Sequence, residues 1–383
     1  MKRVYMDANA TTPLLPEVLE AMAPFWMEQF GNASSIHIHG QQAHKAVEAA
    51  REQVAAFCGC REAEVVFNSG GTEGDNTAIF GVLRPGDHFI TTSIEHSAVL
   101  RAADRMTGHD VQVTFIHPEP SSWIDPEAIR DAIRPNTRLI SVMLANNETG
   151  VLQAVEEIGR IAAAAGALFH IDAVQGAGKV AFNVERFGCH LLSISAHKMH
   201  GPKGVGALYV RKDIHIDPLI IGGNHEHRRR AGTENVPGIV GLGKAAELAM
   251  HSLADGTIDR LSQLRDRLEA GVLQIPGTHV HGGGVLRTAN TTNIGFDGVE
   301  GEALVIALDL KGIAVSGGSA CYSGSTRPSH VLMAMGLSEA VARGSLRFSL
   351  MKTATVEDVD QVLAVLPEAV AHLRELTAAA ARY

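Results

Sequence analysis

A lysine follows an apolar run in the stretch Leu191-Leu192-Ser193-Ile194-Ser195-Ala196-His197-Lys198. Removing an ammonium ion from water is costly, so a lysine at the end of a buried strand needs a chemical reason to be there. Formation of a Schiff base is such a reason. The stretch therefore predicts a strand whose end carries a reactive lysine.

A second apolar strand lies upstream and ends at Asp172, in the stretch His170-Ile171-Asp172-Ala173-Val174-Gln175. A carboxylate in that position could face the protonated ring nitrogen of pyridoxal phosphate. Asp172 and Lys198 together indicate that cofactor.

Strands and helices alternate around these two stretches. Apolar runs predict strands near 64–67, 88–92, 111–116, 138–144, 167–172, 190–194 and 205–210. Helical patterns lie between most of them, over 72–82, 97–106, 126–133 and 155–165. This alternation indicates an α/β fold with a mainly parallel seven-stranded sheet, in which binding residues gather at strand ends.

The two ends of the chain differ from this pattern. Helices are expected over 15–30, beginning at Pro16, and over 41–57. Past Pro237 the expected order is helices over 236–252 and 257–273, strands near 291–296, 313–316 and 345–349, a short helix over 329–335, and a terminal helix over 355–378. We therefore expect a large cofactor-binding domain over 15–250, and a smaller α+β domain made of 1–14 and 251–383.

Composition narrows the class of protein. The chain has 383 residues, 45% hydrophobic content and a formal net charge of −9 spread along its length, which favours an enzyme over a nucleic-acid-binding protein. No apolar run approaches the ~20 residues that span a bilayer, and Met1-Lys2-Arg3 leads into a polar motif, so we expect a cytoplasmic protein with no membrane partner. Four cysteines do not make a disulfide framework and fit a reducing compartment.

A glycine-rich turn follows the first predicted strand of the sheet, in Ser69-Gly70-Gly71-Thr72-Glu73. Backbone amides and the Thr72 hydroxyl at the start of a helix can hold a phosphate. Taken alone, the turn could equally be an ordinary strand-to-helix connection. Ser195 and His197 flank Lys198 closely enough to reach the same phosphate.

One cysteine lies in a setting suited to reactivity. Cys321 is surrounded by glycine and serine in the stretch from Ser316 to Pro328, which is typical of a flexible loop rather than a buried element. A structural cysteine would sit among apolar neighbours. Cys58-Gly59-Cys60 lacks the spacing of a zinc site, so no metal site is expected, with Cys321 as the one possible ligand of an iron–sulfur cluster.

The ordered set of motifs resembles the NifS/IscS-type cysteine desulfurases of the class V aminotransferase family, from Tyr5 to about Leu350. The motifs are Tyr5 to Thr12, Gly31 to Ser35, Ser69 to Glu73, Glu95-His96, Asn146 to Gly150, His170 to Gln175, Ser195 to Lys198, Gly201 to Gly204, Gly232 to Asn235, Ser319 to Cys321 and Arg347 to Ser349. The resemblance implies the fold-type I architecture of pyridoxal-phosphate enzymes and a homodimer with active sites at the subunit interface.

The resemblance also implies roles for individual residues. His96 matches a histidine that stacks on the cofactor ring and assists proton transfer, Asn147 and Gln175 match positions near the ring's phenolic oxygen, and Thr233 would reach the phosphate of the other subunit. Arg347, with Asn147, would hold the substrate carboxylate. Lys198 would carry the cofactor, and Cys321 would take sulfur from L-cysteine as a persulfide while alanine is released.

The chain departs from the family pattern at three positions. Asn224 and Arg228 stand where glycine is common, and so does Met351. None of the three belongs to the expected chemistry. The first two concern the conformation of the loop over 222–230.

Other functions stay open at this stage. A selenocysteine lyase or an aminotransferase would share Lys198 and Asp172, and an aminotransferase would not need Cys321. An assembly subunit with the same fold but no catalytic activity would not need to retain the expected catalytic residues, namely Lys198, Asp172, His96, Cys321 and Arg347. For the sulfur, we expect delivery to a scaffold protein of the IscU/NifU type for iron–sulfur assembly, including a nitrogenase-dedicated route, with tRNA thiolation or another carrier as the alternative.

Overall fold

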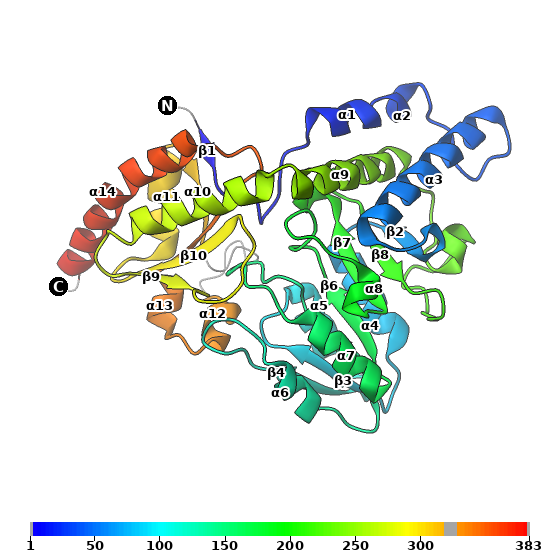
Figure 1. The fold of residues 1–383 in the computed structure, drawn as a ribbon, viewed down its shortest axis with the longest axis horizontal. Coiled ribbons are helices and arrows are strands. Elements are labelled where there is room, and N and C mark those ends of the chain that lie inside the picture. Colours follow the sequence, from blue (N-terminus) through cyan, green and yellow to red (C-terminus); the bar gives the residue numbers. More distant parts are fainter. Residues whose placement is uncertain (1–2, 318–327, 381–383) are drawn as a thin grey trace.

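In the computed structural model, which describes residues 3–317 and 328–380, a seven-stranded sheet forms the centre of the larger part of the molecule (Figure 1). Its strands are β2 (Val65–Asn68), β3 (His88–Thr92), β4 (Gln112–Ile116), β5 (Thr137–Ser141), β6 (Leu168–Asp172), β7 (Leu191–Ser195) and β8 (Gly206–Val210). The order across the sheet is β2-β8-β7-β6-β5-β3-β4. Only β8 runs antiparallel to its neighbours. The predicted mainly parallel seven-stranded sheet is confirmed.

Helices cover both faces of this sheet. The helices α4 (Gly71–Val82) and α5 (Ser97–Thr107) pack on one face, and the other face carries α3 (Ile38–Cys58), α6 (Pro126–Asp131), α7 (Val155–Ala165), α8 (Val184–Phe187) and α9 (Val236–Ala254). Successive residues of one strand enter opposite cores: Leu191 joins the α4 side, whereas Leu192 and Ile194 join the α3 side. Burial on both faces explains the continuous apolar runs of the sequence.

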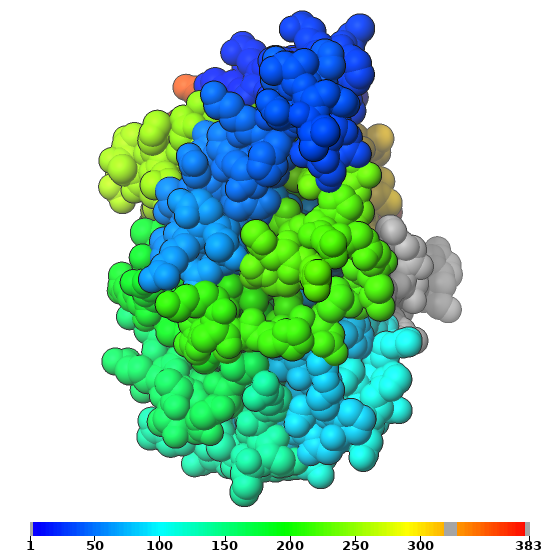
Figure 2. Space-filling view, turned by 90° about the vertical axis from the view of Figure 1, so that its right-hand side faces the viewer, coloured from blue at the N-terminus to red at the C-terminus, as the bar shows by residue number. Residues whose placement is uncertain are grey.

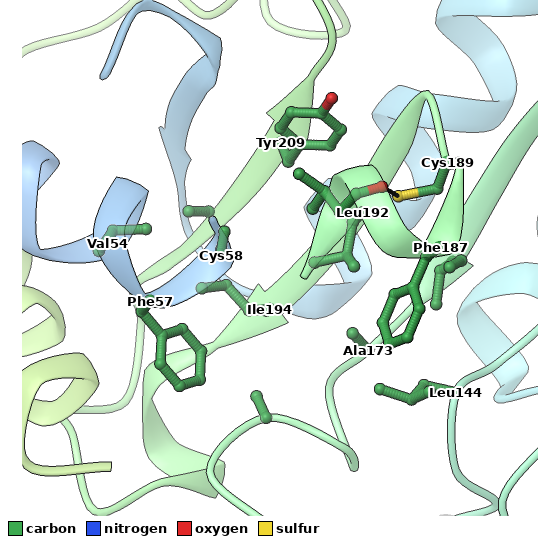
Figure 3. Packing of buried hydrophobic residues seen from close by; sticks show 14 of the residues in the cluster. Val54, Phe57, Cys58, Leu144, Ala173, Phe187, Cys189, Leu192, Ile194 and Tyr209 are labelled. Atoms are coloured by element: carbon green, nitrogen blue, oxygen red, sulfur yellow. Dashed lines mark hydrogen bonds between the residues drawn. The ribbon is translucent and has the colours of Figure 1, made fainter. Parts of the chain in front are cut away.

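Figure 3 shows part of the core on the α3 side. Val54 and Phe57 of α3 lie over Ile194 of β7, and Tyr209 of β8 lies close by. Gly59 follows this helix with φ of 70°, a left-handed angle that glycine adopts without strain and that ends the helix.

A second, smaller unit has its own core (left in Figure 1). Its antiparallel sheet has the order β12-β13-β10-β9, with β9 (Thr278–His281), β10 (Thr291–Phe296), β12 (Ser316–Gly317) and β13 (Ser345–Ser349). Helices α10 (Thr257–Val272), α11 (Gly301–Leu310) and α14 (Val356–Ala380) pack with it, and α12 (His330–Ala334) and α13 (Glu339–Arg343) follow the sheet's lower edge. This is the smaller α+β unit that was expected. The residue limits predicted for the two domains stay a prediction.

The N-terminal arm runs along both units. Its strand β1 (Val4–Tyr5) pairs in parallel with β11 (Ile313–Ala314), and Val4 and Met6 belong to the core of the smaller unit. Three short 3₁₀ turns complete the elements: η1 (Glu62–Glu64), η2 (Ala196–Lys198) and η3 (His225–Arg228).

The helix expected over 15–30 is interrupted. Two short helices, α1 (Pro16–Met22) and α2 (Pro24–Met27), take its place because proline lacks the N–H that would continue the first helix. These helices and the start of α3 form the top of the face shown in Figure 2. Large apolar side chains are exposed in this segment, namely Leu19, Trp26, Met27, Phe30, Ile36 and Ile38.

None of the helices within residues 3–317 and 328–380 combines the length and the apolar character required to cross a membrane.

Candidate active site

The cavity that gathers the predicted site residues opens at the carboxyl ends of β6 and β7. It measures about 250 Å³. Nine of the residues predicted from the sequence line it: Gly71, Thr72, His96, Asn147, Asp172, Gln175, Ser195, His197 and Lys198. Binding at the carboxyl ends of parallel strands is the rule for open α/β sheets. The sheet therefore unites residues that the sequence spreads over more than a hundred positions.

Lys198 lies in the 3₁₀ turn that follows β7. Its Nζ donates hydrogen bonds to the backbone carbonyls of Asn9, at 2.5 Å, and Ala10, at 2.8 Å. Both acceptors belong to the N-terminal arm, so the arm closes one side of the cavity around the lysine.

Asp172 ends β6 and is buried. Its Oδ1 accepts a hydrogen bond from the backbone N–H of Val174 at 2.9 Å. Burial raises the pKa of Asp172, and the neighbouring His96 and Lys198 act in the opposite direction. A buried carboxylate with so few donors gains from a cation placed beside it.

His96 caps the N-terminus of α5. Its Nδ1 accepts the N–H of Ala98 at 3.2 Å, and burial lowers the pKa of His96. A neutral ring held this way carries its hydrogen on Nε2, so His96 offers an N–H donor on that side of the ring. The role in proton transfer that the resemblance implies stays a prediction.

The start of α4 forms a cradle for an anion. Gly70 has φ of 142°, which L side chains rarely adopt, and a Cβ on Gly206 would come within 2.7 Å of the Gly70 Cα. A more open cavity of about 410 Å³ lies at this helix N-terminus and is lined by Gly70, Thr72, Ser195, His197 and Lys203 among others. Backbone N–H groups at a helix start favour a phosphate here.

His197 is neutral in this cradle. Burial and the charges of Lys198 and Lys203 lower the pKa of His197 to about 4. Its Nδ1 lies 3.1 Å from the hydroxyl of Thr11, which leaves Nε2 for another partner.

Arg347 lies in β13 and is only 2% exposed. Its Nη1 donates to the backbone carbonyl of Asn147 at 3.0 Å, and its Nη2 pairs with Asp7 at 2.7 Å. Within the described residues, its Nε and the Oδ1 of Asn147 are buried without a hydrogen-bond partner. A buried unpaired donor is costly, so Arg347 has hydrogen-bonding capacity that a substrate carboxylate could use.

Three predicted residues are not in the lining of this cavity. Arg347 is connected to it through its hydrogen bond to Asn147. Thr233 is exposed and lies outside its lining, so its expected role in another subunit stays a prediction. Cys321 lies outside the described residues. The described residues before this gap end at Gly317. The preceding residue, Ser316 of β12, is directly opposite Arg347 of β13.

A buried polar group behind Asp172 was missed by sequence reasoning. Asp75 of α4 lines the cavity, and its carboxylate lies 3.6 Å from His170, whose ring contacts Ser141 and Ser193 at 2.8 and 3.0 Å. Burial raises the pKa of Asp75. The only sequence signal was a polar residue at a buried helix position. The described residues hold no group of three or more metal-ligating side chains.

Residues 4–362 match the sequence profile of the family described as Aminotransferase class-V. The chain belongs to this family. Its curated relatives include the cysteine desulfurase IscS of Methanosarcina thermophila, 49% identical over 98% of this chain and 94% of the relative, and the cysteine desulfurase of Trichormus azollae, 48% identical over 98% and 95%.

Solved structures agree with the family assignment. A NifS-like protein has a TM-score of 0.91 and 37% identity, covering 97% of this chain and all of its own. A second structure, described as SspA in complex with cysteine, has a TM-score of 0.81 and 37% identity over 91% of this chain and 98% of its own. The fold is that of the fold-type I enzymes, as expected.

Pyridoxal phosphate is the cofactor of this family, and the residues present fit it. Lys198 would supply an amine for its aldehyde, the buried Asp172 would supply a counter-charge for its ring nitrogen, and the start of α4 would supply N–H donors for its phosphate. These are the three groups by which proteins hold this molecule.

Proposed function

We propose that this chain is a pyridoxal-phosphate-dependent cysteine desulfurase, a sulfurtransferase that converts L-cysteine to L-alanine and holds the sulfur as a persulfide on Cys321. The observation that carries the proposal is the meeting of Lys198, Asp172 and Asn147 in one cavity, with Arg347 bonded to Asn147. Relatives named cysteine desulfurase, at 48–49% identity over nearly the whole chain, support the reaction.

Arg347 would hold the substrate by its carboxylate. The unpaired Nε and the partly used Nη2 lie on one edge of the guanidinium, which suits bidentate binding. Asp7 fixes the guanidinium through its ion pair, so the arginine is already oriented when the substrate arrives. Burial removes competing water and strengthens the contact.

When bound, pyridoxal phosphate supplies an aldehyde and an electron-withdrawing ring next to the α-carbon of the substrate. Asp172 would keep that ring protonated through the counter-charge of its buried carboxylate. Lys198 and the neutral His96 line the same cavity, and we assign them to moving the α-proton and the proton that ends on the product.

Cys321 would complete the reaction as a thiolate. It attacks the sulfur of the substrate, an S–S bond forms on the enzyme, and the substrate C–S bond breaks. The electron pair of that bond stays with carbon, which takes a proton and leaves as alanine. Thiol and cysteine thus become persulfide and alanine, with no external oxidant.

We also propose that the chain works as a homodimer. The exposed apolar side chains of α1, α2 and the start of α3 support this, because single soluble chains seldom expose such a set together. The exposed Thr233 would then serve the partner's cofactor.

We propose iron–sulfur assembly as the destination of the sulfur, with a scaffold protein of the IscU/NifU type as acceptor, in the reducing cytoplasm. The relative named IscS supports this destination. Cys58, Cys60 and Cys189 are free thiols, as a reducing compartment requires.

The test is product release by the purified, cofactor-loaded protein. L-Cysteine should yield sulfide and alanine in equal amounts in the presence of a thiol reductant, and Cys321→Ala should lose both. Cys189→Ala is the matched control, because Cys189 is buried with its thiol against the Val184 carbonyl, and it should leave turnover unchanged.

Two results would contradict the proposal. Alanine formation or transamination that persists in Cys321→Ala would assign another pyridoxal-phosphate reaction. A wild type that takes up no cofactor would indicate a subunit without catalysis.

A further inference from the structure

One buried lysine lines a small cavity together with Lys198 and has no role in the reaction described above. This residue, Lys179, lies at the end of the turn that follows β6 and is only 9% exposed. Gly178, with φ of 72°, turns the chain just before it. Burying a lysine requires hydrogen-bond partners for its nitrogen.

Those partners are two neutral carbonyl oxygens. The Nζ of Lys179 donates to Oε1 of Gln175 at 2.6 Å and to Oδ1 of Asn9 at 2.8 Å. The described ion pairs include none with Lys179, and Lys198 and Arg347 are the charges that act on it most. A lysine that contributed only stability would be expected to have a carboxylate partner.

The nitrogen of Lys179 determines which way the Gln175 amide faces. A side-chain amide has one accepting and one donating end, and either end fits a site of the same shape. Both contacts of the Lys179 nitrogen are to oxygens, so it donates an N–H in each and the Gln175 amide presents its oxygen to it. As an ammonium ion the lysine has three N–H groups and no lone pair, so in that form it binds only the oxygen end of the amide.

The donating end of Gln175 is thereby directed away from Lys179. Its Nε2 donates to the carbonyl of Asn9 at 2.9 Å, the same carbonyl that accepts from Lys198. The described residues use no second N–H of this amide, and Gln175 lines the cavity. The amide therefore has a donor left for an oxygen of a bound molecule.

We propose that Lys179 is a positioning residue that locks the Gln175 amide with its N–H toward the cofactor, and so stabilises an ionised oxygen on the cofactor ring. The inference rests on the proposed function, because it takes pyridoxal phosphate as the molecule bound. A donor chain of Lys179, amide and ring oxygen is cooperative, as each hydrogen bond polarises the next.

The experiment compares cofactor binding by single and double variants. Lys179→Met removes the donor at similar length, and Lys179→Gln restores an N–H donor without charge. We expect the dissociation constant for pyridoxal phosphate to rise about tenfold in the first and less in the second. The bound cofactor should also lose part of the absorbance of its ring-ionised form in Lys179→Met.

A double-variant cycle separates positioning from mere packing. In a Gln175→Leu background, Lys179→Met should change the dissociation constant less than about twofold, because the residue it acts through is gone. Lys352→Met is the matched control: this lysine lines the small cavity behind Lys198 together with Lys179, and its nitrogen contacts Ser252 instead. It should bind the cofactor as the wild type does.

Two outcomes overturn the inference. One is wild-type affinity and spectrum in Lys179→Met, and the other is an undiminished effect of that change in the Gln175→Leu background. If Lys179→Met does not fold, as judged by circular dichroism, Lys179→Leu, which also lacks the donor, takes its place and is read by the same criteria. A wild type that binds the cofactor but releases no sulfide from L-cysteine would refute the proposed function, while these binding results would still decide the role of Lys179.

Discussion

Three consecutive residues other than glycine, Glu226, His227 and Arg228, have left-handed backbone angles, with φ of 47°, 54° and 68°. Each such residue costs about 1–2 kcal/mol, because its Cβ crowds the neighbouring carbonyl. Glu226 is held by its buried carboxylate, whereas Arg228 is exposed.

Arg228→Gly should therefore stabilise the protein by about 1 kcal/mol, since glycine adopts this angle freely. Arg229→Gly is the control. This residue has φ of −91° and donates to the Ala63 carbonyl, so its replacement should destabilise by a similar amount. Urea unfolding of both variants measures the difference, and a loss of stability in Arg228→Gly would show that the strain is not where we place it.

At the scale of single residues, the sequence was sufficient to predict those side chains that lie in a recognisable local motif. Lys198 and Asp172 end apolar strands, and Gly71 and Thr72 follow one. Lys179 was missed because its partner Asn9 lies 170 residues away in the chain, and nothing local marks a lysine as buried. Contacts of that kind appear only once the fold is known.

At the scale of elements, strands of the central sheet were predicted to within a few residues because both of their faces are buried. A strand was expected over 138–144, but β5 ends at Ser141. Residues 142–145 are also buried, so their apolar character extended the predicted strand beyond the last hydrogen-bonded residue. The strand β9, at the edge of its sheet, and the helix α13 were not predicted. Both are short, and β9 is half exposed, so their apolar patterns are weak.

One helix and one turn are joined by a buried ion pair. Arg51 of α3 donates from both Nη1 and Nη2 to Glu226 of η3, each at 2.8 Å. Glu226 also accepts the N–H of Phe67 in β2, and the guanidinium lies over the Phe67 ring. The pair holds the strained turn against the strand that leads to the phosphate cradle.

Glu226→Gln should cost about 3 kcal/mol, because it leaves the buried charge of Arg51 with only the exposed Glu48 as an ionic partner. Glu48→Gln removes the other carboxylate that pairs with Arg51. That side chain is 43% exposed, so the cost should stay below about 0.5 kcal/mol. Denaturant unfolding tests the contrast between the two, and equal costs would mean that the buried pair contributes no more than the exposed one.

At the scale of the whole molecule, stability should depend on a set of buried neutral histidines. Burial lowers the pKa of six rings from the ordinary value of 6.5, to about 4 for five of them and to about 3 for His170. The five are His88, His190, His197, His200 and His281. Between pH 6.5 and 4 the unfolded chain binds protons at these positions and the folded chain does not.

The free energy of unfolding should therefore be highest above pH 6.5 and fall steadily as the pH is lowered toward 4. Glu95 acts in the opposite direction, because burial raises its pKa to about 8 and its contribution is lost as the pH rises toward that value. Burial also raises the pKa values of Asp75, Glu148 and Asp172, which act in the same direction as Glu95. We expect the six imidazoles to outweigh these four carboxyls in the acid range. Urea unfolding at pH 7, 6 and 5 provides the test, and a flat profile would refute it.

The ninth residue of the chain has consequences for synthesis. Asn9 donates from its backbone N–H to the hydroxyl of Ser349 and from its side chain to Thr291, and its oxygens hold Lys179 and Lys198. A ribosome makes Asn9 340 residues before Ser349. The N-terminal arm must therefore wait without this partner until Ser349 has emerged. A nascent chain can thus display its reactive lysine well before the pocket exists, and the active centre assembles only after Ser349 has been made.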